Sequence, residues 1–455
     1  MKTNFLEISA ANGWVEGTLQ NVELNDAGWI QLASDVLEGY YESPQIPAPL
    51  FENLVCCWNA TTPKGSWVEL EARVYLPEKE MWSVWGSWGC WSPYIVRRNN
   101  SGRYPKEAPQ IRMNCDILEP LLGAASMLQV RVKLHREEGV DSPVLRRVTV
   151  PLRNKILPAI PCREEELPAL PESCVLDTPA CSQMVRDPEV GNCICNPTTV
   201  SVLLSDRGTQ VLPEIMALST VDLIEGFGNW TYVMAGAGMY GYRAYGRFGD
   251  YDLIKSEIAA GRSVGVSVHY ARTLEKAAER GLPYLEGAPC NTPGHILTVR
   301  GYGVEDGQEY VYVSDSAADS DPECHLRYRK EQFLQAWEGR MCYLVDTQPE
   351  CPALIPEFEY SDLAQDEKGK YYFVHEGQEY PVYADMLTGK KSEPHKMTLM
   401  IRQPQEYSQP RMDANDLFQY PQVDENGNFF LPECAWTVYL ISNTGLRYMS
   451  KKKVL

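Results

Sequence analysis

One proline-rich stretch divides this 455-residue chain into parts that we expect to fold separately. Six prolines fall within the 29 residues 151–179, together with three consecutive glutamates that begin at Glu164. Proline fixes φ and lacks the backbone N–H that helices and sheet ladders use, so neither structure continues easily through such a stretch. We therefore predict an extended linker over residues 151–179 with a domain on each side.

The part before the linker has the pattern of β-strands. Short runs such as residues 67–76 (WVELEARVYL) alternate apolar and polar side chains between clusters of Gly, Pro and Asn. A period of two, repeated at short intervals, is typical of antiparallel strands that bury one face. Residues 1–150 are therefore predicted to form an N-terminal β-sandwich.

Tryptophans are concentrated in this predicted sandwich, which holds eight of the eleven. Four of them follow one another at intervals of three: Trp82, Trp85, Trp88 and Trp91. Residues six apart on a strand share a face, so the four would form two pairs on opposite faces. Two interpretations stay open. Either one pair is exposed and makes the sandwich a binding module for a carbohydrate or peptide, or all four tryptophans fill the core around a bulge at Gly86 and Gly89.

Beyond the linker the pattern becomes mixed. Helix-like stretches are expected at residues 196–205, 231–245 and 251–260, and strands at 263–270, 295–301 and 310–315. This mixture predicts an α+β domain over residues 180–347. Alternation returns after it, at residues 371–374, 397–401 and 436–441, with a turn at 424–428. We interpret residues 351–455 as a small all-β domain.

Charge and composition exclude several classes of partner. The net charge of −19 repels phosphate backbones and anionic lipid, so we expect neither nucleic acid nor membrane as a partner. No apolar run approaches the roughly 18 residues of a membrane span, and the first residues lack the pattern of a secretory signal, so a cytoplasmic location is expected. The fourteen cysteines include no Cys-x-x-Cys pair, and we interpret them as reduced thiols without a metal.

One of these cysteines lies where a helix is predicted to begin. Cys195 directly precedes a stretch in which Pro197 suits a first helical turn and Val200, Leu203 and Leu204 form one apolar side. Unpaired N–H groups at a helix start stabilise a thiolate over a thiol, especially beside an imidazolium. Cys195 is therefore a candidate nucleophile.

A hairpin places a histidine and an aspartate close together. His295 begins the predicted strand 295–301 and Asp315 ends the strand 310–315. A turn centred near residue 305 sets the two opposite each other, and a turn at residues 306–307 displaces them by about three residues. A carboxylate beside an imidazole fixes its tautomer and stabilises its charged form, as a thiolate's partner requires. His269 is the competing base, without a comparable local carboxylate.

Acyl transfer also needs donors aimed at the developing oxyanion. The backbone N–H of Cys195 is one candidate, and the side-chain amide of Gln183, in the loop upstream, is a second.

A glycine pattern, Gly236-x-Gly238-x-x-Gly241, could suggest a dinucleotide-binding loop. Because it lies in a helix-like stretch and follows no strand, it predicts close helix packing.

Five short motifs, in the same chain order, resemble the C39-like (papain-like) cysteine peptidase family. They are residues 182–184 (SQM), 195–199 (CNPTT), 226–230 (GFGNW), 294–302 (GHILTVRGY) and 311–315 (VYVSD). The similarity extends over about residues 174–347. Two positions depart from the family pattern: Asn196 follows the cysteine where Gly or Ser is usual, and Ser316 follows the acid where the family often has proline.

The resemblance implies a papain-like fold for the α+β domain, with Cys195 as nucleophile, His295 as base and acid, Asp315 as orienting carboxylate and Gln183 as oxyanion donor. Asn196 and Trp230 are expected to contact the substrate. The implied function is hydrolysis of a peptide or muropeptide amide bond through a thioester, without metal or organic cofactor. Two alternatives stay open: an amidase or transpeptidase with the same triad, and an inactive peptidase-like domain in a glycan- or peptide-binding protein.

Overall fold

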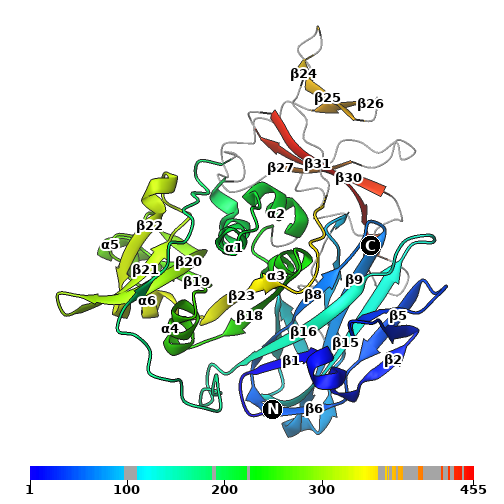
Figure 1. Cartoon of the computed structure of the whole chain (residues 1–455), viewed down its shortest axis with the longest axis horizontal. Coiled ribbons are helices and arrows are strands. Elements are labelled where there is room, and N and C mark those ends of the chain that lie inside the picture. Colours follow the sequence, from blue (N-terminus) through cyan, green and yellow to red (C-terminus); the bar gives the residue numbers. More distant parts are fainter. Residues whose placement is uncertain are drawn as a thin grey trace.

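The computed structural model describes residues 1–96, 110–186, 191–222 and 226–356, and beyond residue 356 only Glu367 and short strand segments. Figure 1 shows two regions side by side: strands from the first 153 residues, and a second sheet surrounded by helices. Together these two regions hold all the residues considered for the candidate site.

The first region consists of two antiparallel sheets. An eight-stranded sheet contains β1 (Phe5–Ser9), β3 (Val22–Leu24), β4 (Ile30–Leu32), β7 (Asn53–Val55), β8 (Cys57–Thr61), β13 (Ile111–Asn114), β14 (Ile117–Pro120) and β16 (Val144–Arg153). A seven-stranded sheet contains β2 (Thr18–Gln20), β5 (Glu38–Glu42), β6 (Ile46–Phe51), β9 (Ser66–Leu76), β10 (Met81–Trp82), β11 (Gly86–Trp91) and β15 (Ala125–Arg136). Short 3-10 turns are η1 (Ala10–Glu16) and η2 (Pro77–Lys79).

Alternation along the strands builds the core of this region. On β9, Val68 and Leu70 are fully buried, whereas Trp67 and Glu69, which alternate with them, are partly exposed. Val68 and Leu70 belong to the same buried cluster as Val148 of β16 in the other sheet. The two sheets therefore bury their apolar faces against each other, as a β-sandwich does.

The tryptophan pairs do not form as the exposed-platform interpretation requires. Trp88 and Trp91 are both fully buried, so neither pair spaced six apart lies on an exposed face. β10 ends at Trp82, and the register of β11 shifts between Ser87 and Cys90. Gly89 within that shift has φ +82°, so the bulge interrupts the period of two on which the pairing rests. A binding role for the sandwich stays a prediction.

The second region contains another seven-stranded sheet, in the order β18-β23-β19-β20-β21-β22, with β17 paired to β20. The strands are β17 (Cys174–Val175), β18 (Tyr242–Phe248), β19 (Val264–Tyr270), β20 (Thr292–Glu305), β21 (Gln308–Ser314), β22 (His325–Arg329) and β23 (Met341–Pro349). The helices are α1 (Cys195–Asp206), α2 (Pro213–Thr220), α3 (Trp230–Met239), α4 (Tyr251–Ala259), α5 (Leu274–Arg280) and α6 (Lys330–Ala336), with 3-10 turns η3 (Gly191–Cys193) and η4 (Asp321–Cys324). None of the helices in the described ranges is long and apolar enough to cross a membrane.

The two faces of this sheet contribute to different cores. Along β23, Tyr343 and Val345 pack into the cluster that also holds the sandwich, α1 and α3. Cys342 and Leu344, which alternate with them, pack with α4, α6 and strands β19 to β22 in a second cluster. We call these the shared core and the rear core. One face of the sheet is thus closed by helices and the sandwich together, and the other mainly by its own helices, with Phe5 of β1 packed against them.

Most elements predicted after the linker are present, with one error. Helices α1 and α4 and strands β19, β20 and β21 occupy the expected stretches. The helix expected over 231–245 ends at Met239, and Tyr242 begins strand β18. Gly241 has φ +89°, a left-handed conformation that ends the helix and turns the chain into the strand. The pattern of glycines at 236 and 238 does mark close packing: a Cβ at Gly236 would lie 2.6 Å from Thr220 of α2.

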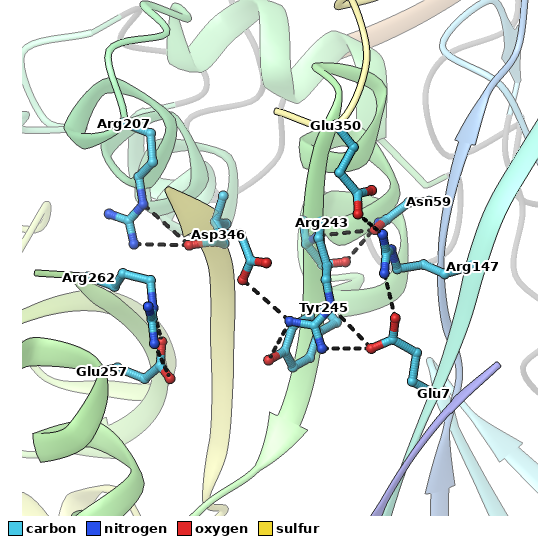
Figure 2. Close-up of polar contacts among 12 residues, drawn as sticks. Glu7, Asn59, Arg147, Arg207, Arg243, Tyr245, Glu257, Arg262, Asp346 and Glu350 are labelled. Atoms are coloured by element: carbon cyan, nitrogen blue, oxygen red, sulfur yellow. Dashed lines mark hydrogen bonds and ion pairs between the residues drawn. The ribbon is translucent and has the colours of Figure 1, made fainter. Parts of the chain in front are cut away.

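Buried polar groups join the sandwich to the second sheet. Asn59 of β8 is fully buried, donates to the carbonyl of Ala244 at 2.7 Å and accepts from its N–H at 3.1 Å. The side-chain amide thus satisfies both backbone groups of Ala244 across the boundary. Figure 2 shows this contact beside an ionic cluster in which Arg147 of β16 pairs with Glu7 and Glu350.

The same cluster continues onto β18. Arg243 pairs with Glu7 at 2.6 Å and with Asp346 at 3.3 Å, and its guanidinium lies over the Tyr245 ring (Figure 2). Residues 154–173 of the predicted linker contain neither helix nor strand and connect β16 to β17.

Strands were expected in the C-terminal part, and several are described there. A four-stranded sheet contains β27 (Thr398–Arg402), β30 (Ala435–Ser442), β31 (Gly445–Val454) and β12 (Ile95–Val96), and smaller sheets contain β24 (Ala364–Gln365), β25 (Tyr371–His375), β26 (Gln378–Val382), β28 (Gln422–Val423) and β29 (Phe429–Phe430). The turn expected at 424–428 lies outside the described residues. A separate all-β domain stays a prediction.

Candidate active site

Cys195 is the first residue of α1, as the sequence predicts. The helix begins with a hydrogen bond from the Thr198 N–H to the Ile194 carbonyl, and its apolar residues Leu203 and Leu204 are fully buried in the shared core. Burial of this side of the helix fixes the position of its first residue. Cys195 as a whole residue is partly exposed.

The surroundings of the Cys195 sulfur favour its anion. Burial raises the pKa of the thiol, but the hydrogen bond and charge of His295 lower it, and the N–H groups of Ile296 and Asn196 lower it further. The net pKa lies below its ordinary value. The imidazole of His295 and the backbone N–H groups of Ile296 and Asn196 therefore favour a thiolate at the start of α1.

His295 lies between Cys195 and Asp315. Its Nε2 is 2.7 Å from Asp315 Oδ1, which leaves Nδ1 for the hydrogen bond with the sulfur. Burial lowers the pKa of His295, but the charge and hydrogen bond of Asp315 and those of Cys195 raise it well above its ordinary value. The imidazolium is thus stabilised from both sides.

Asp315 directly follows β21 and is fully buried. Burial raises the pKa of its carboxyl, yet His295, the Ala317 N–H and Tyr328 lower it, and the net pKa lies below its ordinary value. The carboxylate accepts from the Ala317 N–H at 3.0 Å on the same oxygen that faces His295. The buried charge therefore has hydrogen-bond donors to replace water.

The hairpin between His295 and Asp315 follows the shifted register. Glu305 pairs with Gln308, so Asp306 and Gly307 form a two-residue turn with φ +49° and +79°. This is the second of the two registers considered from the sequence, in which the two residues are not directly opposite. The side chains meet because Asp315 lies just beyond Ser314, which pairs with Thr298 three residues after His295.

Gln183 lies close to the acid's loop. Its side-chain oxygen accepts from the Ser316 hydroxyl at 2.7 Å, and its amide nitrogen donates to the Gly191 carbonyl at 2.7 Å. Its backbone N–H also donates to the Ser316 carbonyl at 2.8 Å. The Gly191 carbonyl accepts one of the two hydrogens that this amide nitrogen carries. The loop after Asp315 thus holds both the acid and Gln183.

The two residues expected to contact substrate have structural contacts of their own. Asn196 is 1% exposed and donates to the carbonyls of Phe227 and Asn229. Trp230, partly buried, begins α3, and its backbone N–H donates to the Asp116 carboxylate of the sandwich. A substrate contact by Asn196 would have to involve its backbone, and both substrate roles stay predictions.

His269, the competing base considered from the sequence, faces a different carboxylate. It lies 3.9 Å from Glu338, and no contact with Cys195 is found among the described residues. Among the described residues, no three His, Cys, Asp or Glu side chains gather as metal ligands would.

Two tyrosines near the acid were not predicted from the sequence: Tyr270 and Tyr328, whose hydroxyls both donate to Asp315. Tyr328 lies in the segment similar to the family, but no local pattern distinguishes it from a core tyrosine.

Solved structures of other proteins show only a slight likeness to this chain. Procathepsin L 3 of the Tenebrio molitor larval midgut is 12% identical, with 40% of this chain and 72% of that chain covered and a TM-score of 0.28. A family two carbohydrate esterase from Cellvibrio japonicus is 10% identical, with 37% of each chain covered and a TM-score of 0.18. The C-terminal CBM6 of a marine laminarinase from Zobellia galactanivorans is 8% identical, with 32% and 99% covered and a TM-score of 0.18. A search of curated proteins found no match.

Comparison with family models gives a clearer result. Residues 175–345 match the model described as the Peptidase_C39 like family. Residues 7–152 match the model described as the Peptidase C39 N-terminal domain. The first match contains all the site residues discussed here except Asp116, and the second contains nearly all of the sandwich. With these two models matched in order along one chain, the protein belongs to the C39-like peptidases.

Proposed function

We propose that this chain is a papain-like cysteine peptidase that cleaves an amide bond with Cys195 as nucleophile, His295 as base and acid, and Asp315 as orienting carboxylate. One observation carries the proposal: the buried His295 lies 2.7 Å from Asp315 and beside Cys195, whose thiol pKa it lowers. An imidazolium held by a carboxylate stabilises a neighbouring thiolate, and a thiolate is the nucleophile that acyl transfer to sulfur requires.

The reaction proceeds in two halves. The Cys195 thiolate attacks the amide carbonyl, a tetrahedral oxyanion forms, and the C–N bond breaks as His295 gives its proton to the leaving amine. A thioester to Cys195 and a free amine result. A water molecule then attacks the thioester while His295 accepts its proton, and release of the carboxylic acid restores the thiolate and imidazolium.

The oxyanion needs hydrogen-bond donors that are in place before the reaction. We assign this role to the second amide hydrogen of Gln183 and the backbone N–H of Cys195. The Ser316 hydroxyl fixes the side-chain oxygen of Gln183, which determines where its nitrogen points. Cys195 lies at the helix start, where the backbone N–H groups lack partners within the helix.

Alkylation tests the nucleophile without knowledge of the substrate. The whole chain is treated with iodoacetamide near pH 6 and the labelled cysteines are mapped by peptide mass. We expect Cys195 to react faster than every other cysteine, and His295→Ala to slow it by on the order of 100-fold. His269→Ala is the matched control and should leave the rate unchanged. If Cys195 reacts no faster than the others, the proposal is wrong.

Peptide cleavage tests the reaction itself. A mixture of synthetic decapeptides is incubated with the protein and the products are identified by mass spectrometry. We expect cleavage that Cys195→Ala abolishes. Rapid alkylation of Cys195 with no cleaved peptide would contradict the peptidase assignment. Products joined to an added primary amine, in place of hydrolysed products, would identify a transpeptidase.

A further inference from the structure

The second oxygen of the Asp315 carboxylate is held by two buried tyrosines. Tyr328 donates to Oδ2 at 2.9 Å and Tyr270 donates to the same oxygen at 3.2 Å. The other oxygen, Oδ1, faces His295 and the Ala317 N–H. Each oxygen of the carboxylate thus has two partners: His295 and the Ala317 N–H at Oδ1, and the two phenols at Oδ2.

A carboxylate in this position depends on such donors. Asp315 is fully buried, and a buried charge without hydrogen bonds would be neutralised by taking up a proton. A protonated Asp315 would no longer stabilise the His295 imidazolium, on which the Cys195 thiolate depends. The phenols therefore act on the ionisation of the acid, and not only on its position.

The two tyrosines are suited to a permanent donor role. They come from β19 and β22, and both rings belong to the rear core with exposed fractions of 0% and 1%. Burial and the Asp315 charge raise the pKa of both phenols well above the ordinary value, so each keeps its proton. Packing in the core restricts the rings to the orientation in which their hydroxyls reach Oδ2.

Tyr270 makes two further contacts near the site. Its ring stands edge-on to the His295 ring, with centroids 6.2 Å apart and planes at 88°. Its hydroxyl also lies 3.9 Å from the Cys290 sulfur. Tyr270 can thus restrain both the imidazole and the carboxylate, whereas the Tyr328 hydroxyl donates to the carboxylate of Asp315.

We infer that Tyr270 and Tyr328 are positioning residues that keep Asp315 ionised with Oδ1 directed at His295, and that the Cys195–His295 ion pair forms near neutral pH because of them. This inference rests on the proposed function. Neither tyrosine touches the reacting sulfur, so both act through Asp315 and His295.

The pH dependence of Cys195 alkylation tests this role. Tyr→Phe variants at 270 and 328 remove only the hydroxyls. In the double variant we expect the midpoint of the alkylation profile to move upward by about one pH unit, with a rate at pH 6 about tenfold lower. Each single variant should move the midpoint in the same direction by less. If the double variant does not fold, Tyr328→Phe alone decides the question.

Tyr302→Phe is the matched control. Tyr302 is a buried tyrosine of β20 in the same rear core, and its hydroxyl has no hydrogen-bond partner among the described residues. This variant should keep the wild-type midpoint. A purely structural role for Tyr270 and Tyr328 would lower thermal stability and leave the midpoint in place, which would overturn the inference.

Failure of the inference can be told apart from failure of the proposed function. An unchanged midpoint in the tyrosine variants, with His295→Ala still slowing alkylation, removes only the role of the phenols. A wild-type Cys195 rate that does not depend on His295 removes the ion pair itself, and with it both proposals.

Discussion

The two sides of the second sheet contribute different parts of the candidate site. Helix α1, which begins at Cys195, packs into the shared core with the N-terminal sandwich. His295 lies two residues before Leu297, and Asp315 two residues after Val313. Residues two apart on a strand share a face, and both of these apolar residues belong to the rear core. The nucleophile therefore depends on a core built jointly by two regions, and the base and acid on a core built mainly by the second, to which the sandwich adds Phe5.

This difference explains why the sandwich and the second sheet are joined so closely. A displacement of the sandwich would move α1 relative to the strands that carry His295 and Asp315. Asp116 of the sandwich accepts from the Trp230 N–H, and Asn229, beside it, accepts from Asn196 next to the nucleophile. The N-terminal region is thus part of the support of the nucleophile, although all three proposed triad residues lie outside it.

The largest expected effect is on the boundary between the two regions. Arg147 is 6% exposed and pairs with Glu7 and Glu350, so Arg147→Ala leaves two carboxylates without their buried partner. We expect a loss of about 3–5 kcal/mol in the free energy of unfolding, measured by chemical denaturation.

Arg262→Ala is the matched control on the other side of the sheet. Arg262 pairs with Glu257 at 2.6 Å, but its side chain is 29% exposed, and the expected loss is about 1 kcal/mol or less. Equal losses in the two variants would contradict the view that the boundary holds the protein together.

A smaller effect is expected from the oxyanion donor. Gln183→Ala should lower kcat by about 10²–10³-fold, because one donor to the transition state is lost. Alkylation of Cys195 by iodoacetamide forms no oxyanion, so its rate should stay unchanged. Steady-state kinetics on a cleaved peptide and alkylation of the same preparation check both parts. A variant that loses alkylation together with kcat would show that Gln183 supports the thiolate and not the oxyanion.

Local patterns in the sequence predicted many of the helices and strands of this fold. The period of two located the strands of the sandwich, and the apolar side formed by Val200, Leu203 and Leu204 located α1 with Cys195 at its start. The hairpin expected around residues 305–307 was enough to bring His295 and Asp315 together, in the second of the two registers considered. These inferences hold because each depends on contacts between residues close in sequence.

Features that depend on distant contacts were not predictable. The shared core joins residues of β16 with residues of α3, and nothing local in either segment indicates the other. The same holds for Tyr270 and Tyr328, which meet at Asp315 from separate strands. The helix expected over 231–245 was too long because apolar residues continue past Gly241 into a buried strand, and periodicity alone does not separate the two.

A more local test of the boundary uses Asn59. Asn59→Ala leaves the N–H and carbonyl of Ala244 without their side-chain partner in a buried site. We expect a loss of about 2–3 kcal/mol in the free energy of unfolding. Asn53→Ala is the control. Within the described part of the chain, this buried asparagine of β7 donates only to its neighbour Glu52, so its loss should be smaller. A reversed order would show that the amide of Asn59 does not join the two regions.

The smallest expected effect is a pH dependence at the same boundary. Burial raises the pKa of Glu7, but the hydrogen bonds and charges of Arg243 and Arg147 outweigh it, and the net pKa lies below the ordinary value of 4.5. A lowered pKa in the folded state means that Glu7 stabilises the protein above its unfolded pKa, and that this stability is lost as the pH falls through the folded pKa. Glu7→Gln should therefore cost about 1 kcal/mol at pH 7 and progressively less below pH ~4, as denaturation at several pH values can show. Because this carboxylate pairs with both regions, a cost that stays constant across that range would mean that its charge does not contribute to holding them together.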